Sequence, residues 1–135
     1  MAKEYDDFSR GLQEFNTKCQ QKATRQLRRI SMKALELIVN GTPVLTGCCR
    51  GNWTVSVGDL CRIYNDQTFD IGGGATIKAG AATISSAKLG RDVLIENSCP
   101  YVFALENGWS RQQPAGSMIA SPLAKLKAAI SSGAK

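Results

Sequence analysis

Apolar residues recur every three or four positions through the first part of the chain. They are Phe8, Leu12, Phe15, Cys19, Ala23, Leu27, Ile30, Ala34, Leu37 and Ile38. This spacing forms one continuous face of a helix, and no proline interrupts it. We therefore predict one long helix from Tyr5 to Val39, ended by Asn40-Gly41.

The predicted helix is too long for the rest of the molecule. At 1.5 Å per residue it measures about 50 Å, whereas a globule of 135 residues is only about 30 Å across. Part of the helix should therefore project beyond its own domain or pack along a neighbouring chain. The pattern thus favours an oligomer.

The remaining pattern predicts a small α+β core over residues 42–132. Alternation of apolar and polar residues indicates strands, and glycines mark turns and helix ends. The predicted elements are a strand over Trp53–Val57, a Gly58-Asp59 turn, a return strand over Leu60–Tyr64, a helix over Ala75–Leu89, a third strand over Arg91–Asn97, a short helix after Pro100, and a helix over Ser117–Ile130. Trp53 opens its strand in phase with the alternation and should lie in the core. The expected fold class is α+β, in one domain over residues 1–135, with the long helix and further helices packed on a mainly antiparallel sheet of three to four strands.

Composition limits the class of protein. Hydrophobic residues make up 43 % of the chain, and no apolar run reaches the roughly 20 residues that span a bilayer. The first residues, MAKEYDDFSRGLQEF, are charged and do not resemble a secretory signal. We expect a chain that is made and kept in a cytoplasm, with no membrane partner.

Residue types also limit the chemistry. The chain has no histidine, so it has no Ser-His-Asp or Cys-His pair. Its five cysteines include no CxxC pair, which argues against a metal site. We interpret the cysteines as small buried residues in a reducing compartment. The sequence therefore predicts no enzyme activity, no metal and no cofactor.

Charge is concentrated on the predicted long helix. The formal net charge is +6, and a second stripe of the helix, roughly 120° from the apolar one, is basic. Its residues are Lys18, Lys22, Arg25, Arg29 and Lys33. Two interpretations stay open: a solvated face or one that meets acidic residues of a neighbouring subunit, and a face turned toward DNA phosphates. No aromatic residue interleaves with these bases, which disfavours stacking on single strands.

Two segments carry a family resemblance. Residues 100–118, PYVFALENGWSRQQPAGSM, and residues 42–47, TPVLTG, followed by Arg50-Gly51-Asn52-Trp53, occur in this order. Together they resemble the neck, head–tail joining or tail-completion protein family of tailed double-stranded DNA bacteriophages. Cys48-Cys49 departs from the polar pair that is more usual after the glycine.

The resemblance implies a structural virion protein of the head–tail junction, assembled in the host bacterial cytoplasm. Such proteins form rings, commonly sixfold, whose partners are the head-closure or connector protein and the tail tube protein. We expect the partner contacts at Tyr101, Glu106, Trp109, Arg111, Gln113 and Pro114, and along the long helix, with Thr42–Thr46 bracing the helix end. A neck ring and a tail terminator remain alternatives. A basic nucleic-acid-binding module is the alternative from another class of protein.

Overall fold

The computed structural model describes residues 2–108 and 115–132. Its elements, in chain order, are α1 (Ala2–Gly41), α2 (Cys48–Gly51), β1 (Trp53–Val57), α3 (Gly74–Ile84), β2 (Val93–Asn97), α4 (Val102–Glu106) and α5 (Ala120–Ser131). The architecture is α+β, as the sequence predicts.

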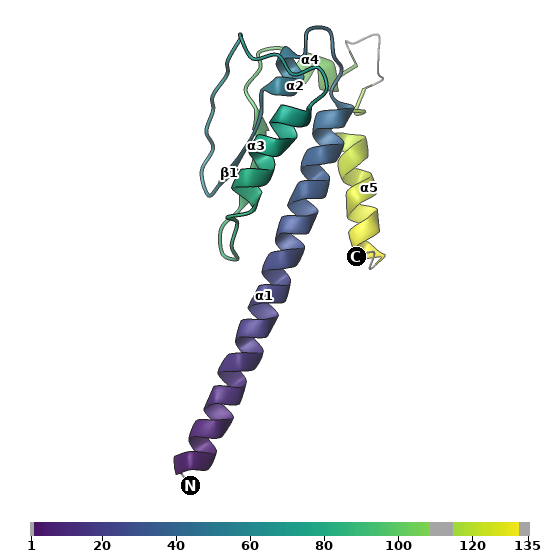
Figure 1. The fold of residues 1–135 in the computed structure, drawn as a ribbon. Coiled ribbons are helices and arrows are strands. Elements are labelled where there is room, and N and C mark those ends of the chain that lie inside the picture. The colour runs from purple at the N-terminus through teal and green to yellow at the C-terminus, as the bar shows by residue number, and fades with distance from the viewer. Residues whose placement is uncertain (1, 109–114, 133–135) are drawn as a thin grey trace.

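Helix α1 dominates the shape of the molecule. It has 40 residues, and its first half projects away from all the other elements, which gather around its second half (Figure 1). Its buried residues all lie in its last third and are Ser31, Ala34, Leu35, Ile38 and Val39. The predictions of one long helix and of a projecting part are both confirmed.

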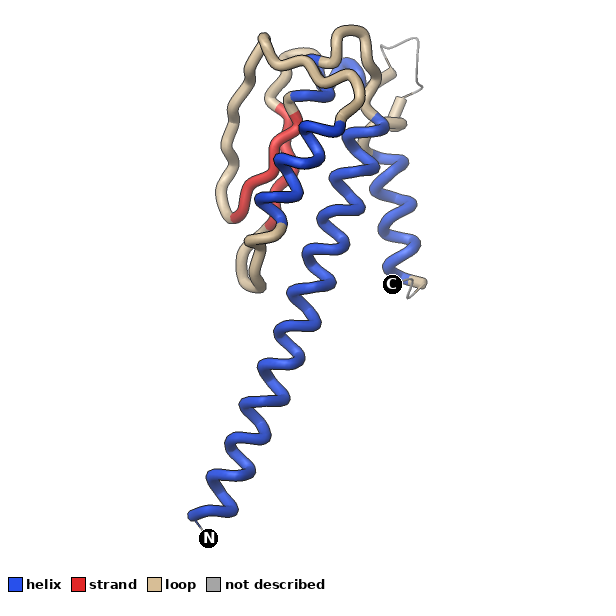
Figure 2. The backbone as a smooth tube through the Cα atoms, in the orientation of Figure 1, coloured by secondary structure: helices blue, strands red, loops and turns tan. Residues whose placement is uncertain are grey.

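The sheet is smaller than predicted. Strand β1 pairs antiparallel with β2, in a register that places Trp53 opposite Asn97 and Val57 opposite Val93. The described residues contain only this two-stranded sheet, so the prediction of three to four strands is not confirmed. Figure 2 shows both strands beside α3, far from the N-terminus.

The predicted return strand over Leu60–Tyr64 is wrong. The Gly58 N–H donates to the Asp92 carbonyl (2.8 Å) and so continues the β1–β2 ladder beyond Val57. The segment after Gly58 is held instead by a side chain, because the Glu96 carboxylate accepts the N–H groups of Cys61 and Arg62. The alternation after the turn predicted a strand, but the partner of β1 comes from a segment much later in the chain.

The core lies where α1, α3, α5 and the sheet meet. Its most buried large side chains include Leu35, Val39, Ile84 and Met118, and Trp53 joins them as predicted. Helix α3 packs closely on α1 and β1 at Gly80, where an added Cβ would fall 2.4 Å from Leu35 and 2.9 Å from Val55. At this closeness an added methyl group would require the Leu35 and Val55 side chains to shift.

The other helices follow the sequence with shifted ends. Helix α3 ends five residues before the predicted Leu89, at Ile84. Helix α5 begins at Ala120 and carries Pro122 in its first turn, where proline is tolerated. The four-residue helix α2 was not predicted, because the Thr42–Asn52 segment reads as a loop.

Candidate interaction surfaces

The projecting half of α1 carries an uncovered apolar stripe. Within the described chain, every residue from Ala2 to Lys22 except Ser9 is exposed. The large apolar side chains of this stripe are Tyr5, Phe8, Leu12 and Phe15, which are 72 %, 67 %, 54 % and 68 % exposed. Cys19 continues the stripe and is also exposed. Four large apolar side chains in one exposed row form a surface that is typical of protein interaction.

The basic stripe also faces solvent. All five of its residues are exposed, namely Lys18, Lys22, Arg25, Arg29 and Lys33. Among the residues that the structure describes, none of the five is held by a hydrogen bond or an ion pair. By contrast, the nearby Arg28 donates to the Ala87 carbonyl (2.9 Å) and is part of the fold. The five bases are therefore available to an anionic partner.

The TPVLTG segment and Arg50 form a structural hub at the C-terminal end of α1. The Arg50 guanidinium donates to the carbonyl groups of Ile71 (2.6 Å), Thr42 (2.7 Å) and Asn40 (3.3 Å). One side chain thereby joins the end of α1 to two loops. Gly47 (φ 86°) lets the chain turn closely against Asp70 and Ile71, where any Cβ would clash with backbone.

Thr42 links α1 to the sheet. Its hydroxyl donates to the Ile38 carbonyl (2.8 Å) and accepts the indole N–H of Trp53 (2.8 Å). Thr42 is 0 % exposed, so both hydrogen bonds are shielded from water. The expected bracing of the helix end is confirmed at this residue.

Three polar residues of the hub were missed in the sequence. The buried Asn52 amide donates to the carbonyl groups of Cys48 (2.7 Å) and Asn65 (3.0 Å), and its oxygen accepts the Asn65 N–H (2.9 Å). The Asn97 amide donates to the Cys49 carbonyl (2.7 Å). No local pattern distinguishes these asparagines from surface ones, because Asn65 and Cys49 are distant from them in sequence.

Asp70 is the third of these residues. Its carboxylate accepts the N–H groups of Gly73 (3.0 Å) and Thr76 (2.8 Å) and the Thr76 hydroxyl (2.7 Å). Burial alone would raise the pKa of Asp70, but these hydrogen bonds and the Arg50 charge outweigh it and hold the pKa below 3.8. An acidic residue just ahead of a glycine-rich helix start was the available signal. The Gly72–Gly74 segment thus serves to start α3.

Tyr101 and Glu106 lie at the base of the loop that follows α4. The Glu106 carbonyl accepts the Gly116 N–H (2.7 Å), which brings the two ends of this loop together. The Tyr101 ring is 42 % exposed. Burial of its hydroxyl and hydrogen bonds with the Cys99 and Cys48 thiols raise the Tyr101 pKa. The other predicted contact residues of the loop, Trp109, Arg111, Gln113 and Pro114, lie outside the described residues.

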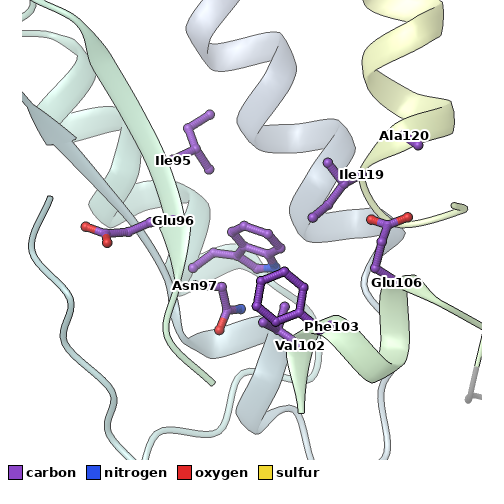
Figure 3. Close-up of a pocket in the computed structure, with 9 residues that line it drawn as sticks. Ile95, Glu96, Asn97, Val102, Phe103, Glu106, Ile119 and Ala120 are labelled. Carbon is purple, nitrogen blue, oxygen red and sulfur yellow. The ribbon is translucent and has the colours of Figure 1, made fainter. Parts of the chain in front are cut away.

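A pocket of about 340 Å³ opens beside α4 (Figure 3). Its apolar lining includes Trp53, Ile95, Val102 and Ile119, and Phe103 stands at it with 79 % of its surface exposed. Its carboxylates are Glu96 and Glu106, which Figure 3 shows on opposite sides. Both Glu106 oxygens are buried and accept no hydrogen bond from the described residues. The pocket therefore has one polar group that a partner's donor would satisfy.

The cysteines fall into two groups. Cys48, Cys49 and Cys99 are buried together near Tyr64 and Tyr101. Burial, followed by the neighbouring Cys99 thiol, raises the pKa of Cys49 to about 12. The interpretation of the cysteines as buried residues holds for these three but is wrong for Cys19 and Cys61, which are exposed.

In residues 2–108 and 115–132, no group of three or more histidine, cysteine, aspartate or glutamate residues is placed to hold a metal ion. Within the same ranges, no helix combines the length and the apolar character that crossing a membrane requires.

Comparison of the chain with protein families, curated proteins and solved structures finds no match. The function therefore has to be argued from the surfaces described above and from the two sequence segments.

Proposed function

We propose that the protein is a structural, non-enzymatic subunit of the bacteriophage head–tail junction, either a neck ring or a tail-completion ring. The observation that carries the proposal is the projecting half of α1 with its exposed row of Tyr5, Phe8, Leu12 and Phe15. A row of this kind needs a protein partner, because water is a poor solvent for it. The resemblance of the two segments supplies the identity of the assembly.

The hub supports a scaffold role for the first of these segments. Thr42, Gly47 and Arg50 hold the end of α1 rigidly against the sheet and the loops. A projecting rod transmits a defined orientation to a neighbour only if its base is fixed. The TPVLTG segment and Arg50 therefore serve the geometry of the assembly, and the contacts themselves fall elsewhere.

The second segment supports a contact role. Its described part includes α4, in which Phe103 is exposed, and Tyr101 just ahead of α4 is exposed as well. Surface loops on a rigid base commonly carry binding residues. In a sixfold ring, contacts from one side of each subunit to the other side of the next would close the circle. The partners above and below such a ring are the head-closure or connector protein and the tail tube protein, in a virion assembled in the bacterial cytoplasm.

The test uses the phage that encodes the chain. We expect a phage without the chain to yield DNA-filled heads beside unattached tails in electron micrographs, and complementation with the wild-type gene to restore joined particles. Normal infectious particles in its absence would refute the proposal. Deletion of residues 2–20, with the hub left intact, should give the same defect if the projecting half is the part that joins.

A second function is favoured by the exposed basic stripe, namely binding of double-stranded DNA through Lys18, Lys22, Arg25, Arg29 and Lys33. Such a module binds free DNA with an affinity that falls steeply as salt rises. A filter-binding titration at two salt concentrations distinguishes the two functions. Tight, salt-sensitive binding by the isolated protein supports the DNA module, and weak binding supports the junction subunit.

A further inference from the structure

The basic stripe is the second half of a longer charged strip on α1. Its side of the helix continues toward the N-terminus through Glu14, Asp7 and Glu4, since the steps from Lys18 back to Glu4 are four, seven and three residues, close to whole helical turns. Apart from Arg10, which lies between Asp7 and Glu14 at the edge of this side of the helix, the strip is acidic up to Glu14 and basic from Lys18 to Lys33. All of these side chains are exposed. The acidic part lies on the projecting half, and the basic part begins where that half joins the domain.

The strip lies on one side only of the apolar stripe. Two parallel helices that face each other along such stripes bring opposite flanks together, so the strip of one meets the flank of the other that carries no strip. Two antiparallel helices bring the same flanks together, so that strip meets strip. The antiparallel orientation also places the acidic part of each strip against the basic part of the other. A parallel pair in register would instead leave each strip without an opposing strip.

We propose that two copies of this chain pair through α1 in an antiparallel, two-fold arrangement. One register satisfies both surfaces. In this register three residues of one copy face residues of opposite charge in the other copy: Glu4 faces Lys33, Asp7 faces Arg29 and Glu14 faces Lys22. The same register places Tyr5 beside Ile30, Phe8 beside Leu27 and Leu12 beside Ala23. Every contact occurs twice because of the two-fold axis.

The residues at the axis complete the register. Cys19 belongs to the apolar stripe and comes close to Cys19 of the other copy. Lys18 of one copy lies beside Lys18 of the other, which is the one contact between like charges within the strip. Its long side chain lets the ammonium group reach solvent. Ile30 is 36 % exposed and so remains available on the half of α1 that joins the domain.

The inference uses the same row of α1 that supports the proposed function, but the two are tested separately. A two-fold contact closes at two copies, so it leaves any ring contacts to the globular part of the chain. A phage whose tails fail to join without the protein supports the junction role, whatever the free chain does. The mass of the free chain tests the pairing, whatever happens in the virion.

The first test measures mass in solution by sedimentation equilibrium with the full chain. We expect twice the chain mass of 14.5 kDa. Two charge-reversed chains probe the contact: the acid-reversed chain carries Glu4→Lys, Asp7→Lys and Glu14→Lys, and the base-reversed chain carries Lys22→Glu, Arg29→Glu and Lys33→Glu. Since each reversal turns every exposed ion pair of the contact into a repulsion, we expect each chain alone to self-associate about 100-fold more weakly. An equimolar mixture should restore a one-to-one dimer.

A matched control separates position from charge. Asp6 is adjacent to Asp7 in sequence but lies on another side of the helix, away from the strip. Asp6→Lys changes the net charge by the same amount as Asp7→Lys. We expect Asp7→Lys to weaken the dimer several-fold more than Asp6→Lys. Equal effects would show that net charge alone acts, and they would overturn the proposed register.

The second test uses the native thiol in the stripe. In a Cys61→Ser chain, Cys19 is the remaining exposed cysteine of the described residues. A short bis-maleimide should convert this chain to a covalent dimer, and Cys19→Ser should abolish the product. Circular dichroism of each variant confirms that it remains helical.

Four outcomes would overturn the inference. They are a monomeric wild-type chain, a dimer that neither reversed chain weakens, a mixture of reversed chains that stays monomeric, and a dimer that Cys19 fails to cross-link. Loss of DNA binding in the base-reversed chain, with its dimer intact, would assign the basic stripe to DNA and overturn the pairing as well.

Discussion

Replacement of Thr42 by valine tests whether the link between α1 and the sheet stabilises the fold as the structure indicates. Valine keeps the shape of the side chain but removes the hydroxyl. The Trp53 indole N–H then loses its acceptor at 2.8 Å, and the Ile38 carbonyl loses a donor at 2.8 Å. The site is fully buried, so water does not replace either group. A buried donor left without a partner costs about 1–3 kcal/mol, and we expect Thr42→Val to lower the free energy of unfolding by about 2 kcal/mol.

The assay is urea unfolding followed by circular dichroism at one fixed protein concentration, because association shifts apparent stability. Thr42→Ser is the control: it retains the hydroxyl, loses one methyl group and should cost only about 1 kcal/mol. In a Trp53→Phe background the donor is absent, so Thr42→Val should cost about 1 kcal/mol less than in the wild type. A Thr42→Val cost below about 0.5 kcal/mol, or a serine variant as unstable as the valine variant, would refute the hydrogen-bond account.

Three further predictions follow from other parts of the structure. The Asp70 carboxylate contributes to stability at pH values above its unfolded-state pKa of 3.8, and this contribution is lost as the pH falls through the lower pKa of the folded state. The stability difference between wild type and Asp70→Asn, measured by urea unfolding, should therefore shrink as the pH drops below 4. A difference that stays constant would contradict this cause. In a native Cys19→Ser chain, a thiol reagent at pH 8 should modify the exposed Cys61 rapidly, and unfolding should be required for the buried group of Cys48, Cys49 and Cys99. Rapid reaction of more than one thiol would count against the buried cluster. Gly80→Ala should cost about 1–3 kcal/mol because its methyl group meets Leu35 and Val55, whereas Gly11→Ala, where nothing lies within 4 Å, should stabilise α1 by about 0.5–1 kcal/mol in a thermal melt.

Local signals in the sequence were sufficient for the longer helices, although they missed the four-residue α2. The spacing of apolar residues in α1, the Asn40-Gly41 pair at its end and the proline in the first turn of α5 each act within a few residues, so the sequence alone locates α1 and α5. The projection of α1 followed from length alone, because the predicted rod exceeded the width of a globule of this size.

The sheet could not be predicted in the same way. Alternation identifies a strand but does not name its partner, and the Gly58-Asp59 turn favoured the nearest apolar segment. In the structure β2 takes that place, and Glu96 binds the backbone of the displaced segment at Cys61 and Arg62. The hub shows the same limit, since Asn52 pairs with Asn65 and Asn97 with Cys49, which only the fold brings near. Long-range pairing is a property of the whole chain and leaves little trace in a short window.

The projecting half of α1 contributes two separable properties to an interface. Backbone hydrogen bonds alone leave an isolated helix marginal in water, and Gly11 weakens it further, so its order depends on a partner that covers Tyr5, Phe8, Leu12 and Phe15. Apolar contact is non-directional and would accept a partner helix in either orientation. The charged strip removes that ambiguity, because only one orientation brings Glu4, Asp7 and Glu14 to the opposite charge. Affinity therefore comes from the apolar stripe and orientation from the strip. For this reason each charge-reversed chain should pair with the other reversed chain and not with itself. The apolar contact should stay intact in that mixed dimer.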